Sequence, residues 1–150
     1  MEGYDRYSRL GCQGGYGGAT VKTAVIILFH GSRAVGAGEI ARKIAAKVGT
    51  QGRFVFVTAA FLQHLTPNLV EAVEVCVQQG AGKIVVVPFF LQLGMHVNAD
   101  IPLLLDQAKK RYPDLRIVTT EAVGSHPQMA EIVVNLVRES DARTVTLEKK

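Results

Sequence analysis

The chain has 150 residues, of which 48% are apolar and 20% charged, and a net charge of +4. This length and composition predict one globular domain with a buried core. The longest apolar run, Ile84–Leu91, is too short to cross a bilayer. The basic block Lys109-Lys110-Arg111 ends a predicted helix, where cations are favoured, and this argues against a nucleic-acid surface.

The cysteines and the N-terminus bear on the compartment. Cys12 and Cys76 match no disulfide or metal spacing, which indicates a reducing environment. The N-terminus lacks the apolar segment of a secretory signal. We therefore expect a cytoplasmic protein.

Composition divides the chain into three parts. Residues 1–22 are rich in glycine and predict a flexible tail, residues 23–140 an α/β domain, and residues 141–150 a polar tail. Within the last part, residues 144–147 could pair briefly as an edge strand.

Between the tails, apolar strand-like runs alternate with helical periodicity. Strands are predicted at residues 23–29, 53–62, 83–90 and 115–123. The first helix is predicted at residues 38–49, and the second begins with Thr66 as cap and Pro67 as first residue and ends at Gly80. The third is expected to run from the cap Asn98 to Tyr112. The fourth follows Ser125 and Gln128, which have capping-box spacing, and its inward residues are predicted to be Met129, Ile132, Val133, Leu136 and Val137.

This alternation predicts a single α/β domain with a four-stranded parallel sheet flanked by helices. The expected strand order is the flavodoxin-like 2-1-3-4. In this arrangement the strand order reverses between the first and third strands, and ligands of such folds bind in the crevice at this switch point.

The four histidines of the chain, His30, His64, His96 and His126, each follow the end of a predicted strand. The carboxyl ends of parallel strands meet at one edge of the sheet, so a metal site or a proton-transfer site there is expected. His30 and His96 should face each other across the crevice. The alternative for each is a structural role, in which the histidine is buried or hydrogen-bonded within its loop and binds no ligand.

The His30–His96 pair predicts a particular kind of metal site. Neutral imidazoles bind Fe, Co, Ni and Zn, and a site with two of them and open positions is weak and exchangeable, whereas structural zinc takes four ligands. The residues around His96 are unusually apolar for a loop. They favour a pocket for a flat, apolar ligand with a polar centre.

Four segments carry a family resemblance: "FHGSR", "AFLQHLTPNLVEAV", "IVVVPFFLQLGMHVNADIP" and "AVGSHPQMAEIV". From about Thr23 to Glu139 the chain resembles the small class II tetrapyrrole chelatases, that is, the CbiX-like sirohydrochlorin cobaltochelatases and ferrochelatases and the related nickel chelatase. The resemblance implies ATP-independent insertion of Co²⁺, Fe²⁺ or Ni²⁺ into sirohydrochlorin or a related tetrapyrrole, in cobalamin or siroheme biosynthesis. It also implies a homodimer, a metal that is substrate rather than permanent cofactor, and no nucleic-acid or membrane partner.

The resemblance also assigns roles to residues. His30 and His96 match the two metal-binding histidines, and with Gln63 they form the expected catalytic set. The tetrapyrrole is expected to contact Ser32, Phe89, Phe90, Leu91, Gly94, Met95 and His126. His126 precedes a predicted helix, whose N-terminus favours anions such as the substrate carboxylates.

Gln63 departs from the family pattern, because many members carry glutamate there. Glutamine is neutral and cannot act as a base near pH 7. Either His64 or a metal-binding histidine takes the proton, or activity is lower, or the function has changed. The main alternative is therefore a non-catalytic metal or tetrapyrrole carrier on the same scaffold. A histidine phosphatase is disfavoured by Phe29, which stands where an arginine is wanted, and a nucleotide binder by the loose match of residues 30–39 to a phosphate loop.

Overall fold

A computed structural model describes residues 20–92 and 94–147, apart from the side chains of residues 95–97 and 141–147. Cys12 and most of the predicted N-terminal tail lie outside the described residues. The elements follow the order β1 (Thr23–Phe29), α1 (Ala37–Gln51), β2 (Phe56–Phe61), α2 (Leu69–Gln78), β3 (Lys83–Pro88), α3 (Met95–Arg111), β4 (Arg116–Thr119), the 3₁₀ helix η1 (Val123–Ser125) and α4 (Met129–Leu147).

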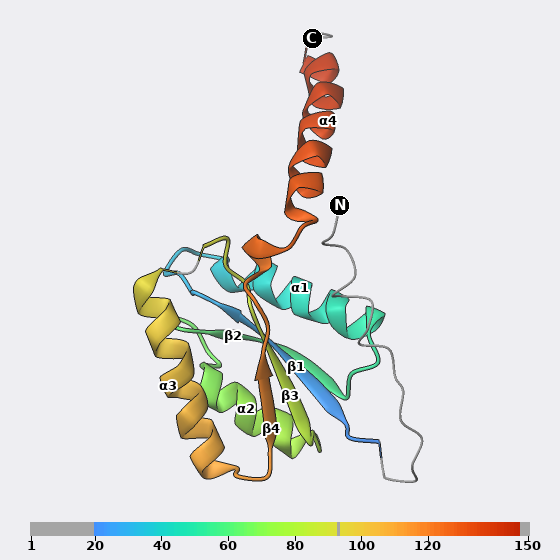
Figure 1. The fold of residues 1–150 in the computed structure, drawn as a ribbon. Coiled ribbons are helices and arrows are strands. Elements are labelled where there is room, and N and C mark those ends of the chain that lie inside the picture. The colour runs from blue at the N-terminus through green and yellow to red at the C-terminus, as the bar shows by residue number, and fades with distance from the viewer. Residues whose placement is uncertain (1–19, 93, 148–150) are drawn as a thin grey trace, which may run out of the picture.

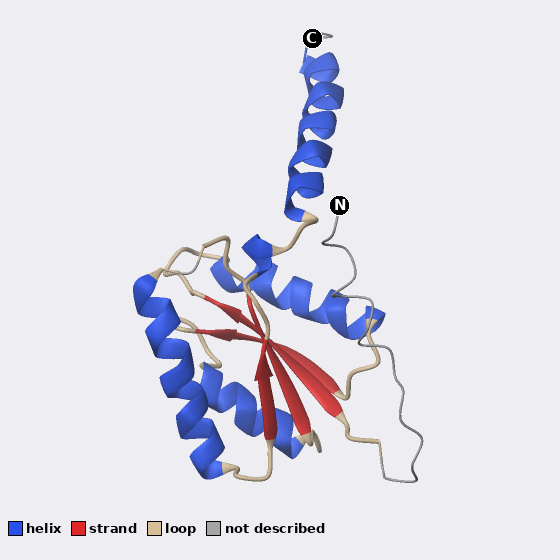
Figure 2. Cartoon of the chain, in the orientation of Figure 1, coloured by secondary structure: helices blue, strands red, loops and turns tan. Residues whose placement is uncertain are grey.

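The strands form one parallel sheet in the order β2-β1-β3-β4, which confirms the predicted topology (Figure 2). β1 is central, with β2 on one side and β3 on the other. The order in which strands are added to the sheet reverses between β1 and β3, so the switch point lies at the carboxyl ends of these two parallel strands.

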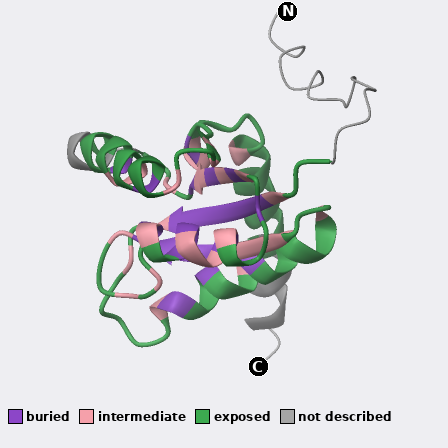
Figure 3. Cartoon of the chain, turned by 90° about the horizontal axis from the view of Figure 1, so that it is seen from below, coloured by how far each residue is buried: buried purple, intermediate pink, exposed green. Residues whose placement is uncertain are grey.

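Helices lie on both faces of the sheet (Figure 1). On one face, α2 and α3 cover Ile26, Leu28, Ile84 and Val86, which are fully buried. On the other face, α1 approaches closely because Ala41 and Ala45 are small, and it packs on β1 and β2. Figure 3 shows that burial is concentrated in the central strands, while the outer sides of the helices are exposed.

On the face of the sheet where α1 packs, the side chains near β4 are less well buried than those of β1 and β2. Val85 and Val87 of β3 point to this face and are only half-buried, while Val118 of β4 and Phe89 are each 37% exposed. We call Val85, Val87, Phe89 and Val118 the open sheet face.

Two helices begin at different residues from those predicted. α2 starts at Leu69, because Asn68 and Glu71 form a reciprocal capping box in which each side chain accepts from the other's backbone N–H. Thr66 is therefore not the cap. α3 starts at Met95, since the N–H of Asn98 already donates to the carbonyl of Gly94 at 3.1 Å. Asn98 thus lies inside the helix that it was expected to cap.

The prediction for α4 is wrong in its packing. Ile132, Val133, Leu136 and Val137, expected to point inward, are 49–60% exposed, because α4 projects away from the domain (Figure 1). Ser125 lies in η1 rather than at the start of α4, and the helix continues to Leu147 through the expected edge strand. Neither α4 nor any other helix in the described part of the chain is long and apolar enough to span a membrane.

Cys76 is fully buried in α2, and this burial raises the pKa of its thiol from 9.0 to about 12. In a Cys12→Ser background, we expect Cys76 to react with Ellman's reagent on the order of a thousandfold more slowly in the native protein than in denaturant at about pH 8, because the thiolate is the nucleophile. Rapid native labelling would contradict the packing of α2.

Candidate active site

His30 follows the central strand directly, and three neighbouring strand ends meet around its ring. The ring Nδ1 of His30 lies 2.9 Å from Nε2 of Gln63, which follows β2 by two residues. The ring of Phe90, beyond β3, stands edge-on to the His30 ring with centroids 6.5 Å apart. The imidazole itself is exposed. The switch point therefore presents a histidine whose ring is oriented by its neighbours.

Backbone hydrogen bonds hold these loops together beyond the strand ends. The N–H of Leu62 donates to Phe29 at 3.0 Å, and the N–H of Gln63 donates to His30 at 3.1 Å. Gly31 has φ +91°, and a Cβ at this position would overlap the carbonyl oxygen of Gln63. Glycine is thus required for the close approach of the two loops, and that approach brings the Gln63 amide to His30.

The hydrogen bonds around His30 suit two forms of the ring. When Nδ1 accepts from the amide of Gln63, Nε2 carries the proton of the neutral imidazole. When Nε2 binds a metal, the proton belongs on Nδ1, where the Gly31 carbonyl, 3.3 Å away, can accept it. Rotation of the Gln63 amide would offer a second acceptor. A glutamine can therefore orient His30 in both forms, whereas a carboxylate can only accept.

His64 lies beside this pair and contacts the loop that follows β1. Its Nδ1 accepts from Nε of Arg33 at 3.3 Å. His64 is the one non-glycine residue in the described part of the chain with a positive φ, 66°. Such a conformation costs of the order of 1 kcal/mol and persists where neighbouring contacts hold it. His64 is therefore fixed on the exposed surface next to Gln63, with a cationic side chain against its ring.

Two predicted residues have local partners in their own loops. The hydroxyl of Ser32 accepts from the N–H of Ala34 at 3.1 Å and shapes the turn after β1. His126 caps the end of η1, and its Nδ1 accepts from the N–H of Gln128 at 3.3 Å. His126 also lines a hollow of about 480 Å³ together with Val87 and residues 120–123. Their predicted contact with substrate stays a prediction.

The second predicted metal ligand is placed only by its backbone. His96 lies in the first turn of α3, after the cap Gly94, and the side chains of Met95 and His96 lie outside the described residues. The His30–His96 pairing is thus a prediction still. Among the described side chains, no three His, Cys, Asp or Glu residues gather as a metal-binding group.

The residues expected to form an apolar wall of the tetrapyrrole pocket have different surroundings in the structure. Phe89 packs on Phe29, with ring centroids 4.7 Å apart, and Phe90 stands beside His30. Leu91 is 72% exposed. Phe90 is therefore the member of the wall with a direct contact to the candidate metal ligand.

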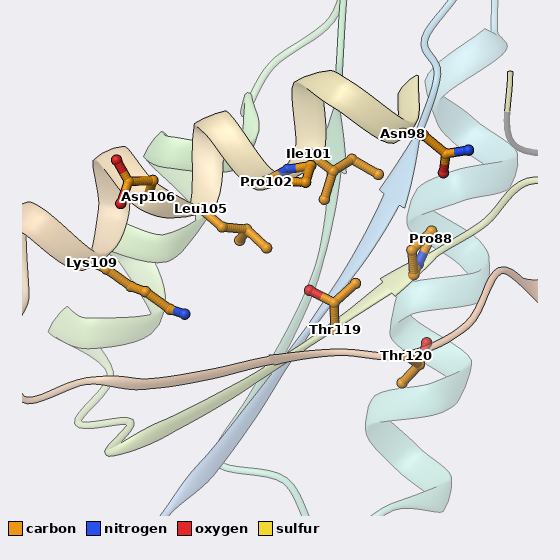
Figure 4. Close-up of a pocket in the computed structure, with 9 residues that line it drawn as sticks. All are labelled: Pro88, Asn98, Ile101, Pro102, Leu105, Asp106, Lys109, Thr119 and Thr120. Carbon is orange, nitrogen blue, oxygen red and sulfur yellow. The ribbon is translucent and has the colours of Figure 1, made fainter. Parts of the chain in front are cut away.

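A hollow of about 430 Å³ lies between α3 and the ends of β3 and β4 (Figure 4). Its lining is Pro88, Asn98, Ile101, Pro102, Leu105, Asp106, Lys109, Thr119 and Thr120. Its first lining residue in α3, Asn98, lies two residues after His96. Sequence patterns gave no sign of this lining, although Thr119 and Thr120 lie at the carboxyl end of β4, where ligand-binding residues are expected.

The family model CbiX matches residues 24–140. The chain belongs to the CbiX family. It is 33% identical over 137 residues to the sirohydrochlorin cobaltochelatase of Methanopyrus kandleri, covering 78% of this chain and 96% of that protein. It is 31% identical over 109 residues to the chloroplastic sirohydrochlorin ferrochelatase of Arabidopsis thaliana, covering 73% of this chain and 48% of that protein.

Solved CbiX-type structures share the fold. A CbiX protein of Marinobacter aquaeolei superposes with a TM-score of 0.71 at 25% identity, covering 81% of this chain and 98% of that chain. The sirohydrochlorin chelatase SirB of Bacillus subtilis, in complex with cobalt, gives a TM-score of 0.72 at 29% identity and covers 79% of this chain and 50% of that chain. The chain therefore spans nearly all of one CbiX relative and half of the other.

Replacing Gly31 with alanine tests the close approach of the loops. We expect Gly31→Ala to lower the free energy of unfolding by about 3 kcal/mol, from a left-handed backbone cost of about 1–2 kcal/mol plus overlap with Gln63. Gly80→Ala is the matched control, because Gly80 has φ +82° and open space around its Cβ position. If urea unfolding gave the same decrease in the free energy of unfolding for both variants, the overlap of the new Cβ with Gln63 would contribute nothing, contrary to the prediction.

Proposed function

We propose that this CbiX protein inserts Co²⁺ or Fe²⁺ into sirohydrochlorin without ATP. The observation that carries the proposal is the exposed His30 ring, held at the switch point by Gln63 in a chain whose curated relatives are sirohydrochlorin chelatases. The relatives' names support both metals, and nickel stays a third prediction from the motif resemblance.

His30 and His96 would hold the incoming metal through imidazole nitrogens. Two ligands leave coordination positions open, so the ion can pass from protein nitrogens to ring nitrogens. With its amide rotated so that Oε1 accepts the Nδ1 proton, Gln63 would keep the His30 ring in place while the ring's Nε2 is free to bind the metal. Phe90, edge-on to that ring, offers apolar surface next to the metal for the macrocycle.

Insertion replaces two pyrrole protons with one divalent ion, so two protons must leave. The Gln63 amide cannot take a proton near pH 7. Imidazole nitrogen is the available base, either on His64 or on His30 once the metal has left it. We propose that His64, whose backbone is fixed beside Gln63, takes the first proton at Nδ1 once this nitrogen has parted from Nε of Arg33.

Two cations, one beside His64 and one farther along α3, fit an anionic substrate. Arg33 lies at the loop after β1, and Lys109 lines the hollow that begins near the His96 backbone (Figure 4). These charges would attract the carboxylates of sirohydrochlorin. The cytoplasmic location and the homodimer also remain predictions.

The alternative function is a carrier that binds metal or tetrapyrrole without catalysis, and Gln63 is the observation that favours it. An insertion assay with sirohydrochlorin and Co²⁺, Fe²⁺ or Ni²⁺ in parallel separates the two functions. Followed by the absorbance of the macrocycle, the wild-type protein should accelerate insertion over the uncatalysed rate. Binding of substrate without acceleration would establish the carrier.

Alanine variants test the two metal ligands. We expect His30→Ala and His96→Ala each to slow insertion on the order of 100-fold, because each removes a metal-binding nitrogen. Gln78→Ala, at the exposed end of α2, is the control and should keep the wild-type rate. Undiminished insertion by both histidine variants would overturn the two-histidine site.

Replacing Gln63 tests whether a carboxylate at this position speeds insertion. Gln63→Glu should speed insertion, on the order of 10-fold, because a carboxylate adds a base next to the metal and pairs with the Nδ1 proton of His30. Gln63→Leu, which removes both hydrogen-bonding groups, should slow it. A Gln63→Glu enzyme that folds normally but is no faster would remove the carboxylate argument.

A further inference from the structure

Two side-chain contacts join the loops that follow β1 and β2. The first is the hydrogen bond between Gln63 and His30, which belongs to the candidate metal site. The second involves the residue after Gln63 and the third residue after His30, because Nε of Arg33 donates to Nδ1 of His64 at 3.3 Å. Arg33 and His64 are both exposed. They are therefore open to a molecule that binds at the carboxyl edge of the sheet.

The backbone of His64 is held by its own loop, whereas Arg33 reaches the contact through a long side chain. The N–H of Phe61 donates to the carbonyl of Pro67 at 2.9 Å, and this bond closes the loop that contains His64. The positive φ of His64, 66°, is fixed within that closed loop. The contact can therefore break by movement of the arginine side chain while the imidazole stays in place.

The contact with Arg33 determines whether His64 can accept a proton. A guanidinium has donors only, so Nδ1 of His64 uses its lone pair to accept from Arg33. The neutral ring then carries its own proton on Nε2. One ring nitrogen is occupied and the other is already protonated. While the contact lasts, His64 has no nitrogen available as a base.

Arg33 has no anionic partner among the described side chains. The ion pairs in that part of the chain are Lys110–Asp106 and Arg111–Glu74. A carboxylate accepts from a guanidinium through two parallel N–H groups and carries the opposite charge, whereas neutral imidazole accepts through one nitrogen. A carboxylate is therefore a stronger partner for Arg33 than the ring of His64 is.

We propose that a carboxylate of the tetrapyrrole draws Arg33 away from His64 and so frees Nδ1 of His64 to accept a pyrrole proton. The N–H bond of the pyrrole breaks, and its electron pair stays on the pyrrole nitrogen for the incoming metal. The proton forms a new N–H bond at Nδ1. The exposed imidazolium then releases a proton to water. Arg33 thus makes the base available when the substrate is bound.

This inference rests on the proposed function and deepens it, because it links substrate binding to proton removal. The exchange of Arg33 between its two partners needs no metal, so it can be observed without insertion. A protein in which His64 responds to metal-free sirohydrochlorin but which inserts no metal would retain the exchange and overturn the proposed function. Insertion by a protein in which His64 does not respond would overturn the exchange alone.

The ring nitrogens of His64 report the exchange directly. Two-bond ¹H–¹⁵N spectra of protein with ¹⁵N-labelled histidine, at about pH 8 where model imidazole is neutral, distinguish protonated, hydrogen-bonded and unbonded nitrogens. The resonances of His64 are assigned by their loss in His64→Asn, since asparagine tolerates a positive φ.

Saturating metal-free sirohydrochlorin should shift the Nδ1 resonance of His64 toward that of an unprotonated nitrogen without a donor. Arg33→Ala should show this shifted position before any ligand is added, and the ligand should then change it little. An Nδ1 resonance that is the same in the free and the saturated wild-type protein overturns the proposal.

Steady-state kinetics separate control of the base from a structural role of Arg33. Arg33→Ala should raise the KM for sirohydrochlorin on the order of 10-fold and leave kcat nearly unchanged, because binding loses a contact whereas His64 needs no release. His64→Asn should instead lower kcat on the order of 100-fold, because the base is removed. Arg53→Ala is the matched control and should change neither constant, since Arg53 is exposed and precedes β2 at the opposite edge of the sheet.

The opposite kinetic result would assign Arg33 to the support of its loop. If Arg33→Ala keeps the circular dichroism of the folded wild type but lowers kcat as much as His64→Asn does, Arg33 is needed to hold the base rather than to release it. That result overturns the proposal.

Discussion

The position of β1 is the constraint on which the rest of the structure depends. β1 pairs with β2 on one side and β3 on the other, and residues 24–28 are at most 5% exposed. Burying an unpaired polar or charged side chain within such a strand would cost several kcal/mol, and the first polar side chain after these residues is that of His30. The same pairing continues past the strand ends, and it brings the loops after β1, β2 and β3 to one place.

Sequence patterns predicted the fold best where a strand is buried on both faces, because such a strand is a continuous apolar run. The apolar run of β1 and the alternation of strands and helices led to the correct sheet order. The Gln63–His30 hydrogen bond was not predictable, because it depends on the approach of two loops at Gly31 and on a side-chain rotamer. The prediction that Ile132, Val133, Leu136 and Val137 of α4 point inward is wrong, because periodicity marks an apolar side but does not say where the helix leaves the domain.

Gln63 stands where many family members carry glutamate, and it changes the chemistry at the carboxyl edge of the sheet. An amide donates and accepts, so it can orient His30 in either ring form, but it contributes no charge and takes no proton. A carboxylate at the same place would add negative charge next to a dication and hold the metal more tightly. With glutamine the metal is held less tightly, and proton removal shifts to imidazole. Loss of the carboxylate is thus compatible with catalysis as well as with a carrier.

The anchor at Gly124 links the candidate site to the start of α4. Through the Phe90 carbonyl, η1 is attached to the residue whose ring stands beside His30. η1 also lines the hollow beside His126 through Val123, at the same carboxyl edge of the sheet. The contact that holds Phe90 in its loop thus also fixes the point at which the chain leaves the sheet for α4.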